Sequence, residues 1–275
     1  MANTVSTAFI AQYNADIHLA YQRAELLRGT VRTAEANGST YIFQKLGTGT
    51  ATNKARNGNV VPMNPTHSTA TATLTDKYAP EYVDKLDLLK LNIDERGSLV
   101  KTAVMALQRE ADDQIITILE AHTGTSTSNI TYAGTTITIA KVTDWIMRGL
   151  FGADVPDDGE VTAVLGWKEY GSLMALQQFT GWEYVGDARK WTRGSSAVKW
   201  MNVTWIPHSG LTANTVSGGC TSYAYHKSAI GHAIGSEVKT AIDWIPEKVA
   251  WLIDAYMSMG AVAIDSNGIS MTGNY

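Results

Sequence analysis

Cysteine is almost absent from this sequence of 275 residues, and neither sign of charge dominates it. The single cysteine, Cys220, excludes an intrachain disulfide and any zinc or iron–sulfur site built from several cysteines. Lys and Arg number 22 against 26 Asp and Glu, which gives a formal net charge of −4. A nucleic-acid-binding module or a protein of anionic membranes would carry a basic surplus, so both classes are disfavoured.

Long apolar runs are missing as well. The longest stretch without a charged residue, 200–226, is rich in Ser, Thr, Asn and Gly, so it does not predict a membrane span. The N-terminal residues lack the basic region and the apolar segment of a secretory signal. We therefore expect a chain that folds in the cytosol and has no membrane partner.

Motifs of catalysis are absent too, namely the Gly-x-Ser-x-Gly elbow, the P-loop and His-Glu-x-x-His. Gly47 and Gly49 lack the third glycine of a nucleotide-binding turn. Cys220, His226 and His232 lie near one another in sequence, but a strand end and a Gly-rich helix without a fourth ligand favour structural roles. The sequence predicts no enzyme, no cofactor and no metal site.

Two adjacent carboxylates, Asp112 and Asp113, fall within a predicted helix. They point about 100° apart and do not pair as acid and base. We interpret them as part of a solvated helix face or as salt-bridge partners of Lys or Arg.

An amphipathic helix is predicted at 6–28. Apolar residues recur every three or four positions, among them Phe9, Tyr13 and Ile17, and Gly29 stands where a helix ends. Such an arm requires a surface to pack on, either in its own domain or in a neighbour.

A long hairpin is predicted next. Residues 39–46 and 68–75 have strand character, and the intervening 47–66 is rich in Gly, Thr and Asn. The return strand alternates Thr with Ala, so neither face offers much to bury, and an isolated two-stranded ribbon is marginal in water. We expect the ribbon to lie across another surface, with Lys54 and Arg56 at its tip meeting an acidic patch of a neighbouring protein more readily than phosphate.

The clearest element is a helix over 94–122, with Asp94 as N-cap and a length of about 40 Å. Lys101, Gln108, Arg109 and Asp112 are predicted to point away from its apolar stripe. That stripe comprises Val100, Val104, Leu107, Ala111, Ile115 and Ile118.

The rest of the chain predicts a mixed domain, and all eight Trp lie at or beyond Trp145. Helices are expected at 141–150 and 168–179, and a further short one carries Gly231 and Gly235. The Trp and Tyr residues of 182–205 favour core packing over sugar or base stacking. Strands are expected in a hairpin at 129–139, at 161–166, 198–207 and 222–227, and through most of 237–275.

The order of these parts and two short sequence motifs resemble those of a known family. The segment YAYHKSAIGHAIG (223–235) is similar to a motif that recurs in members of this family and combines aromatic residues, His, a basic residue and Ala. It precedes a predicted strand that ends in Asp243-Trp244. The segment AVAIDSNGI (261–269) is similar to the last strand and turn. The family is that of the major capsid proteins of tailed bacteriophages, with the Hong Kong 97 fold.

The resemblance implies an α+β fold with four parts. These are an N-terminal arm (1–36), an extended loop (37–78), a peripheral domain with a long spine helix and a β-sheet (79–124 and 237–275), and an axial domain (125–236). Intersubunit contacts would come from Phe9, Tyr13 and Ile17 in the arm and from Lys45, Lys54 and Arg56 at the loop tip. The spine helix would pack through Val104, Leu107, Ala111 and Ile115.

The resemblance also implies a function and partners. The chain would assemble into hexamers and pentamers of an icosahedral shell around double-stranded DNA, which it would bind without sequence specificity. It would be assembled in the host bacterial cytoplasm and reside in the virion, with a portal and a separate scaffolding protein, because no fused scaffolding segment precedes the arm. Covalent crosslinking is not predicted: Lys45 and Lys54 lie in the loop, but the other two residues of such a link have no assignment.

Three alternatives stay open at this point. An encapsulin, which is a bacterial nanocompartment shell of the same fold, would enclose enzymes instead of a genome. An α/β enzyme built on 140–275 and a glycan-binding protein are further possibilities. The Thr-rich loop favours the phage protein.

Overall fold

The computed structural model describes residues 22–23, 25–85, 95–122, 130–131, 137–180, 198–212 and 220–273. These residues form two compact units. Unit 1 draws on Asp76–Arg109 and Ser236–Met257, and unit 2 on Glu25–Thr75, Glu110–Gly235 and Ser258–Tyr275. None of the described helices is both long and apolar enough to cross a membrane.

Unit 2 is built on a six-stranded sheet with the order β6-β13-β10-β7-β9-β8. Its central strand β7 is buried along its whole length, parallel to β9 and antiparallel to β10, which suits its apolar sequence. The strands are β6 (Ile130–Thr131), β7 (Val161–Leu165), β8 (Val198–Trp200), β9 (Val203–Pro207), β10 (Ser222–His226) and β13 (Ile269–Gly273).

Short helices of unit 2 share a core with this sheet. Trp145 and Trp205 meet edge to face with ring centroids 5.9 Å apart, and Leu150, Leu173 and Phe179 are fully buried in the same cluster. This outcome confirms that the aromatic residues among the described part of 182–205 serve the core. The helices are α3 (Ile139–Thr143), the π-helix η2 (Asp144–Leu150), η3 (Phe151–Ala153), α4 (Trp167–Met174) and α5 (Gln177–Thr180).

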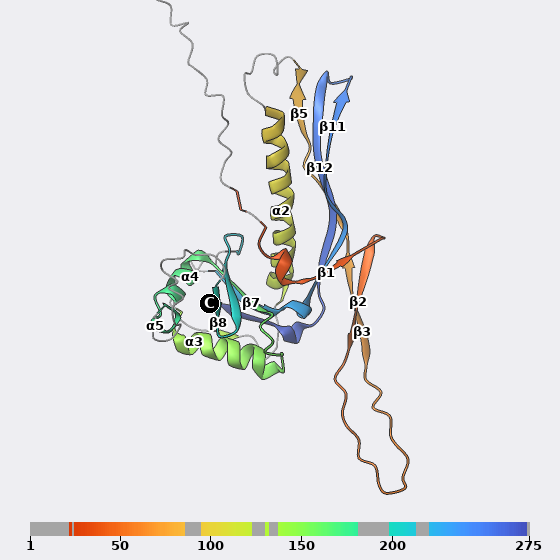
Figure 1. The fold of residues 1–275 in the computed structure, drawn as a ribbon, viewed down its shortest axis with the longest axis vertical. Coiled ribbons are helices and arrows are strands. Elements are labelled where there is room, and N and C mark those ends of the chain that lie inside the picture. Colours follow the sequence, from red (N-terminus) through yellow and green to blue (C-terminus); the bar gives the residue numbers. More distant parts are fainter. Residues whose placement is uncertain are drawn as a thin grey trace, which may run out of the picture. The chain divides into compact units, whose positions relative to one another are not determined.

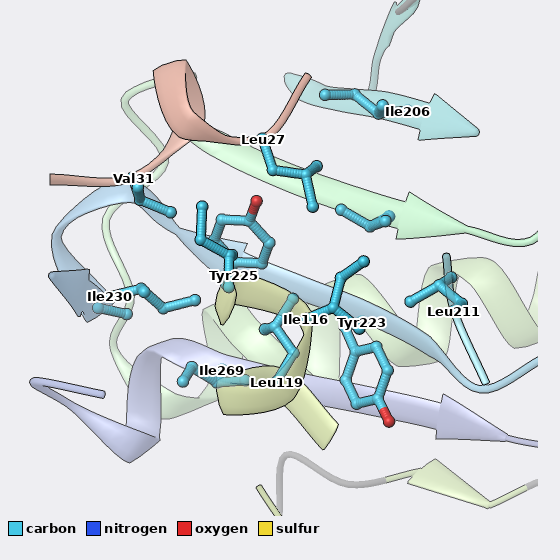
Figure 2. Close-up of a cluster of buried hydrophobic side chains, with 13 residues drawn as sticks. Leu27, Val31, Ile116, Leu119, Ile206, Leu211, Tyr223, Tyr225, Ile230 and Ile269 are labelled. Atoms are coloured by element: carbon cyan, nitrogen blue, oxygen red, sulfur yellow. The ribbon is translucent and has the colours of Figure 1, made fainter. Parts of the chain in front are cut away.

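A second cluster of unit 2 joins segments that are far apart in sequence (Figure 2). Leu27 and Val31 flank the short helix η1 (Arg28–Thr30) and pack with Leu119 of the long helix and Ile230. The Tyr225 hydroxyl is 2.6 Å from Thr30 Oγ1, and burial raises the pKa of this phenol. The C-terminal part of the predicted arm (1–36) is thereby fixed to the core of unit 2.

The predicted long helix is confirmed as α2 (Glu95–Ala121). One stripe of its buried residues recurs every four positions, at Ala103, Leu107, Ala111, Ile115 and Leu119. Val104 and Ile118 are only partly buried, since they lie at the margin of this stripe. The prediction that Asp112 lies on a solvated face is wrong, because Asp112 is fully buried.

Unit 1 contains parts of two long strands, β11 (Ile230–Ile245) and β12 (Ala250–Ala263), which also contribute residues to unit 2. Strand β5 (Glu81–Asp84) pairs antiparallel with the start of β12. Strand β4 (Thr75–Tyr78) is also a neighbour of β12. In unit 1, β5 and β11 therefore lie on opposite sides of β12 (Figure 1).

The predicted hairpin is confirmed as a two-stranded ribbon within unit 2 (Figure 1). Strand β2 (Thr40–Leu46) pairs antiparallel with β3 (His67–Thr73) over seven residue pairs, from Thr40 opposite Thr73 to Leu46 opposite His67. The expectation that neither face has much to bury is wrong at the base of the ribbon, where Phe43 and Ala72 are buried.

Several sequence-based assignments of secondary structure are wrong. The helix predicted at 6–28 does not extend through its described C-terminal part, since residues 22–23 and 25–27 are not helical. Residues 198–207 form two strands instead of one, because Met201 and Asn202 adopt positive φ angles of 54° and 58° and turn the chain back. The helix expected around Gly231 and Gly235 is the beginning of β11, which pairs in parallel with β1 (Arg32–Glu35). Helical periodicity of Ala and Ile cannot be told from a buried strand over so few residues.

The last strand of the chain lies in the sheet of unit 2. Strand β13 pairs with β10 and β6 in the sheet of unit 2, where Ile269 is fully buried. The turn before it, η5 (Ser266–Gly268), follows Asp265, whose side chain accepts a hydrogen bond from Asn267 N.

Candidate assembly surfaces

The ribbon presents a long exposed surface beyond its base. Only one backbone hydrogen bond, from Gly47 N to Thr66 O (2.7 Å), joins the two arms just past the strands. Farther out, the Thr52 hydroxyl donates to Val61 O at 2.9 Å. Val60, Val61 and Met63 are 73%, 57% and 53% exposed, so the loop carries apolar side chains that nothing among the described residues covers.

Lys54 and Arg56, predicted at the tip, are both exposed there. Lys54 precedes and Arg56 lies within a turn closed by the hydrogen bond from Gly58 N to Ala55 O, with Asn57 at a φ of 62°. Asn tolerates this left-handed conformation better than most residues. The predicted contact of both cations with a neighbouring subunit stays a prediction.

Lys45, the third residue predicted at the tip, lies elsewhere. It stands near the end of β2, and its ammonium is 2.7 Å from Asp265 Oδ1. The alternation of β2 directs its side chain to the same face as Phe43. Its observed role is therefore to hold the base of the ribbon to unit 2.

The base is fixed by close packing as well. Phe43 lies so near Gly231 that a Cβ there would be 2.5 Å from a Phe43 ring carbon. Only glycine leaves room for the ring, which packs in a small cluster with Ala36, Ala72 and Ala233. The direction of the ribbon from unit 2 is set by these contacts.

Asp112 organises the C-terminal part of the predicted arm (1–36). Its Oδ2 accepts from Leu26 N (3.0 Å) and lies 3.2 Å from His208 Nε2, while Oδ1 accepts from Leu27 N (3.0 Å). His208 Nδ1 accepts from Gly210 N, so its ring proton is on Nε2 and is donated to Asp112. A fully buried carboxyl thus satisfies three donors.

Sequence reasoning missed this site, although a signal existed. Asp112, Ile116 and Leu119 are spaced as one helical stripe, which adjoins the predicted one. The arm residues Phe9, Tyr13 and Ile17 lie outside the described residues. Val104, Leu107, Ala111 and Ile115 lie on α2 as described above.

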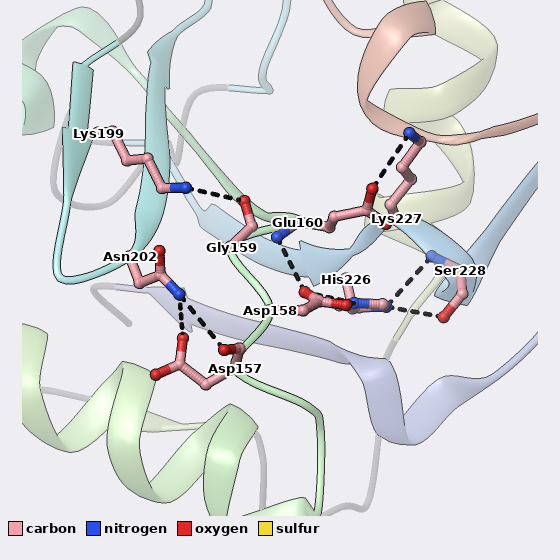
Figure 3. Close-up of polar contacts among 9 residues, drawn as sticks. All are labelled: Asp157, Asp158, Gly159, Glu160, Lys199, Asn202, His226, Lys227 and Ser228. Atoms are coloured by element: carbon pink, nitrogen blue, oxygen red, sulfur yellow. Dashed lines mark hydrogen bonds and ion pairs between the residues drawn. The ribbon is translucent and has the colours of Figure 1, made fainter.

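A polar cluster surrounds the acidic turn before β7 (Figure 3). An Asp158 carboxylate oxygen accepts a hydrogen bond from Glu160 N at 3.0 Å, and the carboxylate is 3.1 Å from His226 Nε2. Both contacts lower the pKa of the Asp158 carboxyl, and the backbone amide of Glu160 has the larger effect. Lys227 Nζ lies 3.5 Å from Glu160 Oε1. Ligand atoms of Asp158, Glu160 and His226 fall within 4.8 Å of one another.

The protonation of His226 decides what this cluster can do. Its Nδ1 accepts from Ser228 N, which leaves the proton of a neutral ring on Nε2, facing Asp158. A cation there would displace that proton and compete with Lys227 for Glu160. The arrangement serves as an ion-pair and hydrogen-bond network that ties the acidic turn to β10.

The one cysteine, Cys220, offers no activated thiol. Burial, followed by the nearby Glu169, raises its pKa, so the thiol keeps its proton at neutral pH. His226 is engaged with Asp158 and Ser228 as described, and His232 is fully buried on β11.

A protein-family model and several solved structures are similar to this chain, and they point to the same class of protein. A family model described as phage capsid protein matches residues 5–271. No curated protein matches the chain. Among solved structures, the capsid of the cyanophage P-SCSP1u is 13% identical with a TM-score of 0.76, covering 100% of this chain and 97% of that one.

Two further structures are similar. A chain of Mycobacterium phage Che8 is 14% identical with a TM-score of 0.73 and covers 98% of both chains. A capsid chain of a native GTA particle is 12% identical with a TM-score of 0.78, covering 97% of this chain and 95% of that one. At these identities the structures show the fold, and they confirm the predicted fold class.

Proposed function

This chain belongs to the phage capsid protein family, and from that premise we propose that it is the major capsid protein of a tailed phage, which assembles through its ribbon into hexamers and pentamers of a closed shell. The observation that carries the proposal is the ribbon. Its base is fixed to its own unit by Phe43 and Lys45, while the apolar loop beyond is exposed. A surface of that kind is completed by a neighbouring copy.

The domain roles follow the sequence-based assignment. We assign 1–36 as the arm, 37–78 as the extended loop, 79–124 with 237–275 as the peripheral domain and 125–236 as the axial domain. The confirmed helix α2 and ribbon β2–β3 support the two central assignments. The arm residues Phe9, Tyr13 and Ile17 and the tip residues Lys54 and Arg56 are proposed to contact neighbouring subunits.

Partners and location follow from the same premise. We assign the shell to the virion, with assembly in the host cytoplasm, a separate scaffolding protein and a portal. The net charge of −4 suits a lining that holds double-stranded DNA without a specific site and lets it leave. The family match favours a phage shell over an encapsulin.

The test replaces 48–65 by a two-residue Asn-Gly turn. Gly47 N donates to Thr66 O at 2.7 Å, so these two residues are the hydrogen-bonded pair that such a turn requires, and the hairpin closes without a change to the core. We expect the variant to fold, with unchanged circular dichroism and melting, yet to form no closed shells in negative-stain microscopy. A second variant keeps the natural length of the loop but replaces its residues by Gly and Ser. It should also form no closed shells, because it lacks the apolar side chains of Val60, Val61 and Met63. Shells formed by either variant would contradict the proposed role of the ribbon.

A further inference from the structure

Strand β11 has an open edge in unit 1. On the side away from β12 it pairs with β1, but only through residues 231–234. Along 238–245 no strand among the described residues covers that side. The backbone groups on this edge are a template for another strand.

The sequence of this edge offers little protection against pairing. Exposed edges are normally blunted by proline, bulges or several lysines, and 238–245 (VKTAIDWI) contains one lysine and no proline. Ile242 and Trp244 are 46% and 37% exposed. A long edge with exposed apolar side chains favours a strand partner over water.

We propose that this edge pairs antiparallel with the same edge of a second copy, around a two-fold axis through Ala241. This inference rests on the proposed shell function, because it names one contact within that shell. An isologous contact of this kind closes on itself, so it links two copies and does not propagate into fibres.

The charges select the register. With Ala241 opposite Ala241 of the partner subunit, each Lys239 stands opposite an Asp243 of the partner subunit, which gives two favourable cross-strand pairs. A shift that puts Thr240 opposite itself would oppose Asp243 to Glu237, and the shift that puts Ile242 opposite itself would leave no charge pair. Both Lys239 and Asp243 are exposed on the strand and available for this contact.

The same register joins apolar side chains. Val238 faces Trp244 of the partner subunit, and Thr240 faces Ile242 of the partner subunit. Trp244 is already packed edge to face on Trp251 of β12, with ring centroids 5.3 Å apart, so it is presented in an ordered position. An ordered aromatic side chain loses little entropy when it is covered.

The first experiment is oxidative crosslinking of assembled particles of the Ala241→Cys variant. Directly opposed residues of antiparallel strands have Cα atoms about 4.5–5.5 Å apart, within the range of a disulfide. Thr240→Cys is the matched control, because the two copies of residue 240 would be diagonal, about 7–8 Å apart. We expect covalent dimers from Ala241→Cys and none from Thr240→Cys or from the wild type, whose one cysteine is Cys220.

The second experiment reverses the charges. Lys239→Asp and Asp243→Lys each turn two favourable pairs into two repulsive ones, which should weaken association about tenfold. The double variant restores both ion pairs with the two charges exchanged, so it should assemble like the wild type. Recovery of this kind does not follow if the residues only affect folding.

The outcomes separate the two proposals. Closed shells of Ala241→Cys without covalent dimers, equal crosslinking at 240 and 241, or no recovery in the double variant would each overturn the edge pairing and leave the shell function intact. A wild-type chain that stays monomeric would contradict the shell function itself.

Discussion

The buried carboxyl of Asp112 provides the sharpest test of how the chain end is held. An Asp112→Asn substitution keeps the shape of the side chain and exchanges one acceptor oxygen for a donor nitrogen. Both oxygens are in use: one accepts from Leu27 N, and the other accepts from Leu26 N and His208 Nε2. Whichever way the amide is turned, an N–H group faces another N–H group.

The magnitude follows from the number of donors left without an acceptor. With the amide nitrogen toward Leu27, one buried donor is orphaned; in the other orientation two are. Each buried unsatisfied group costs about 1–3 kcal/mol, and the approach of two donors adds to it. We expect a loss of about 3 kcal/mol of unfolding free energy, which for a chain of this size lowers Tm by about 6–12 °C.

The assay combines thermal melting of unassembled subunits with amide hydrogen exchange. The amide of Leu27 should lose protection selectively, since the less costly orientation of the new side chain leaves this amide without its acceptor. Asp113→Asn is the matched control, because Asp113 is exposed on the same helix, and its Tm should change by no more than about 2 °C. Unchanged protection at Leu27 in Asp112→Asn would refute the reasoning.

Two further predictions concern stability. Ala111→Asp places a carboxylate at a fully buried position of α2 and should cost about 3–5 kcal/mol, visible as a large drop in Tm; an unaltered Tm would mean that the buried face is misassigned. Asp158 has a carboxyl pKa lowered by the amide of Glu160 and by His226, so it stabilises the fold above the ordinary Asp pKa of about 3.9 and loses this effect as the pH falls below it. The difference in urea midpoint between the wild type and Asp158→Asn should therefore shrink between about pH 6 and pH 3; a constant difference would contradict the assignment.

Elements with strong periodicity were predictable from the sequence. Helix α2 and the strands β2, β3 and β7 begin and end within one or two residues of the predicted bounds. Each of them combines a long pattern with flanking turn residues, so local preference and tertiary packing agree. The same agreement made the order of parts, and hence the family resemblance, visible.

The failures arose where tertiary contacts decide. Residues 230–235 have small and apolar side chains that suit a helix or a strand, and pairing with β1 selects the strand. Asp112 was placed on a solvated face because its acceptor role depends on backbone donors 85 and 86 residues away. Lys45 was assigned to the tip although the sequence placed it in the predicted strand 39–46, because the strand pattern does not reveal its ion-pair partner, Asp265, far away in the sequence.

The ribbon combines a rigid base with an unsupported outer part, and this division has an energetic reason. Ordering a chain on assembly costs about 1–2 kcal/mol per residue for the backbone alone. The strands of the ribbon are ordered during folding, before any neighbour is present. Two contacts fix them, namely Phe43 packed on Gly231 and the ion pair of Lys45 with Asp265. Only the loop beyond Gly47 is left to be ordered by its contact, so a modest apolar surface such as that of Val60 and Val61 is enough to hold it. A fully rigid ribbon would bind at one angle alone, whereas a shell of hexamers and pentamers requires two.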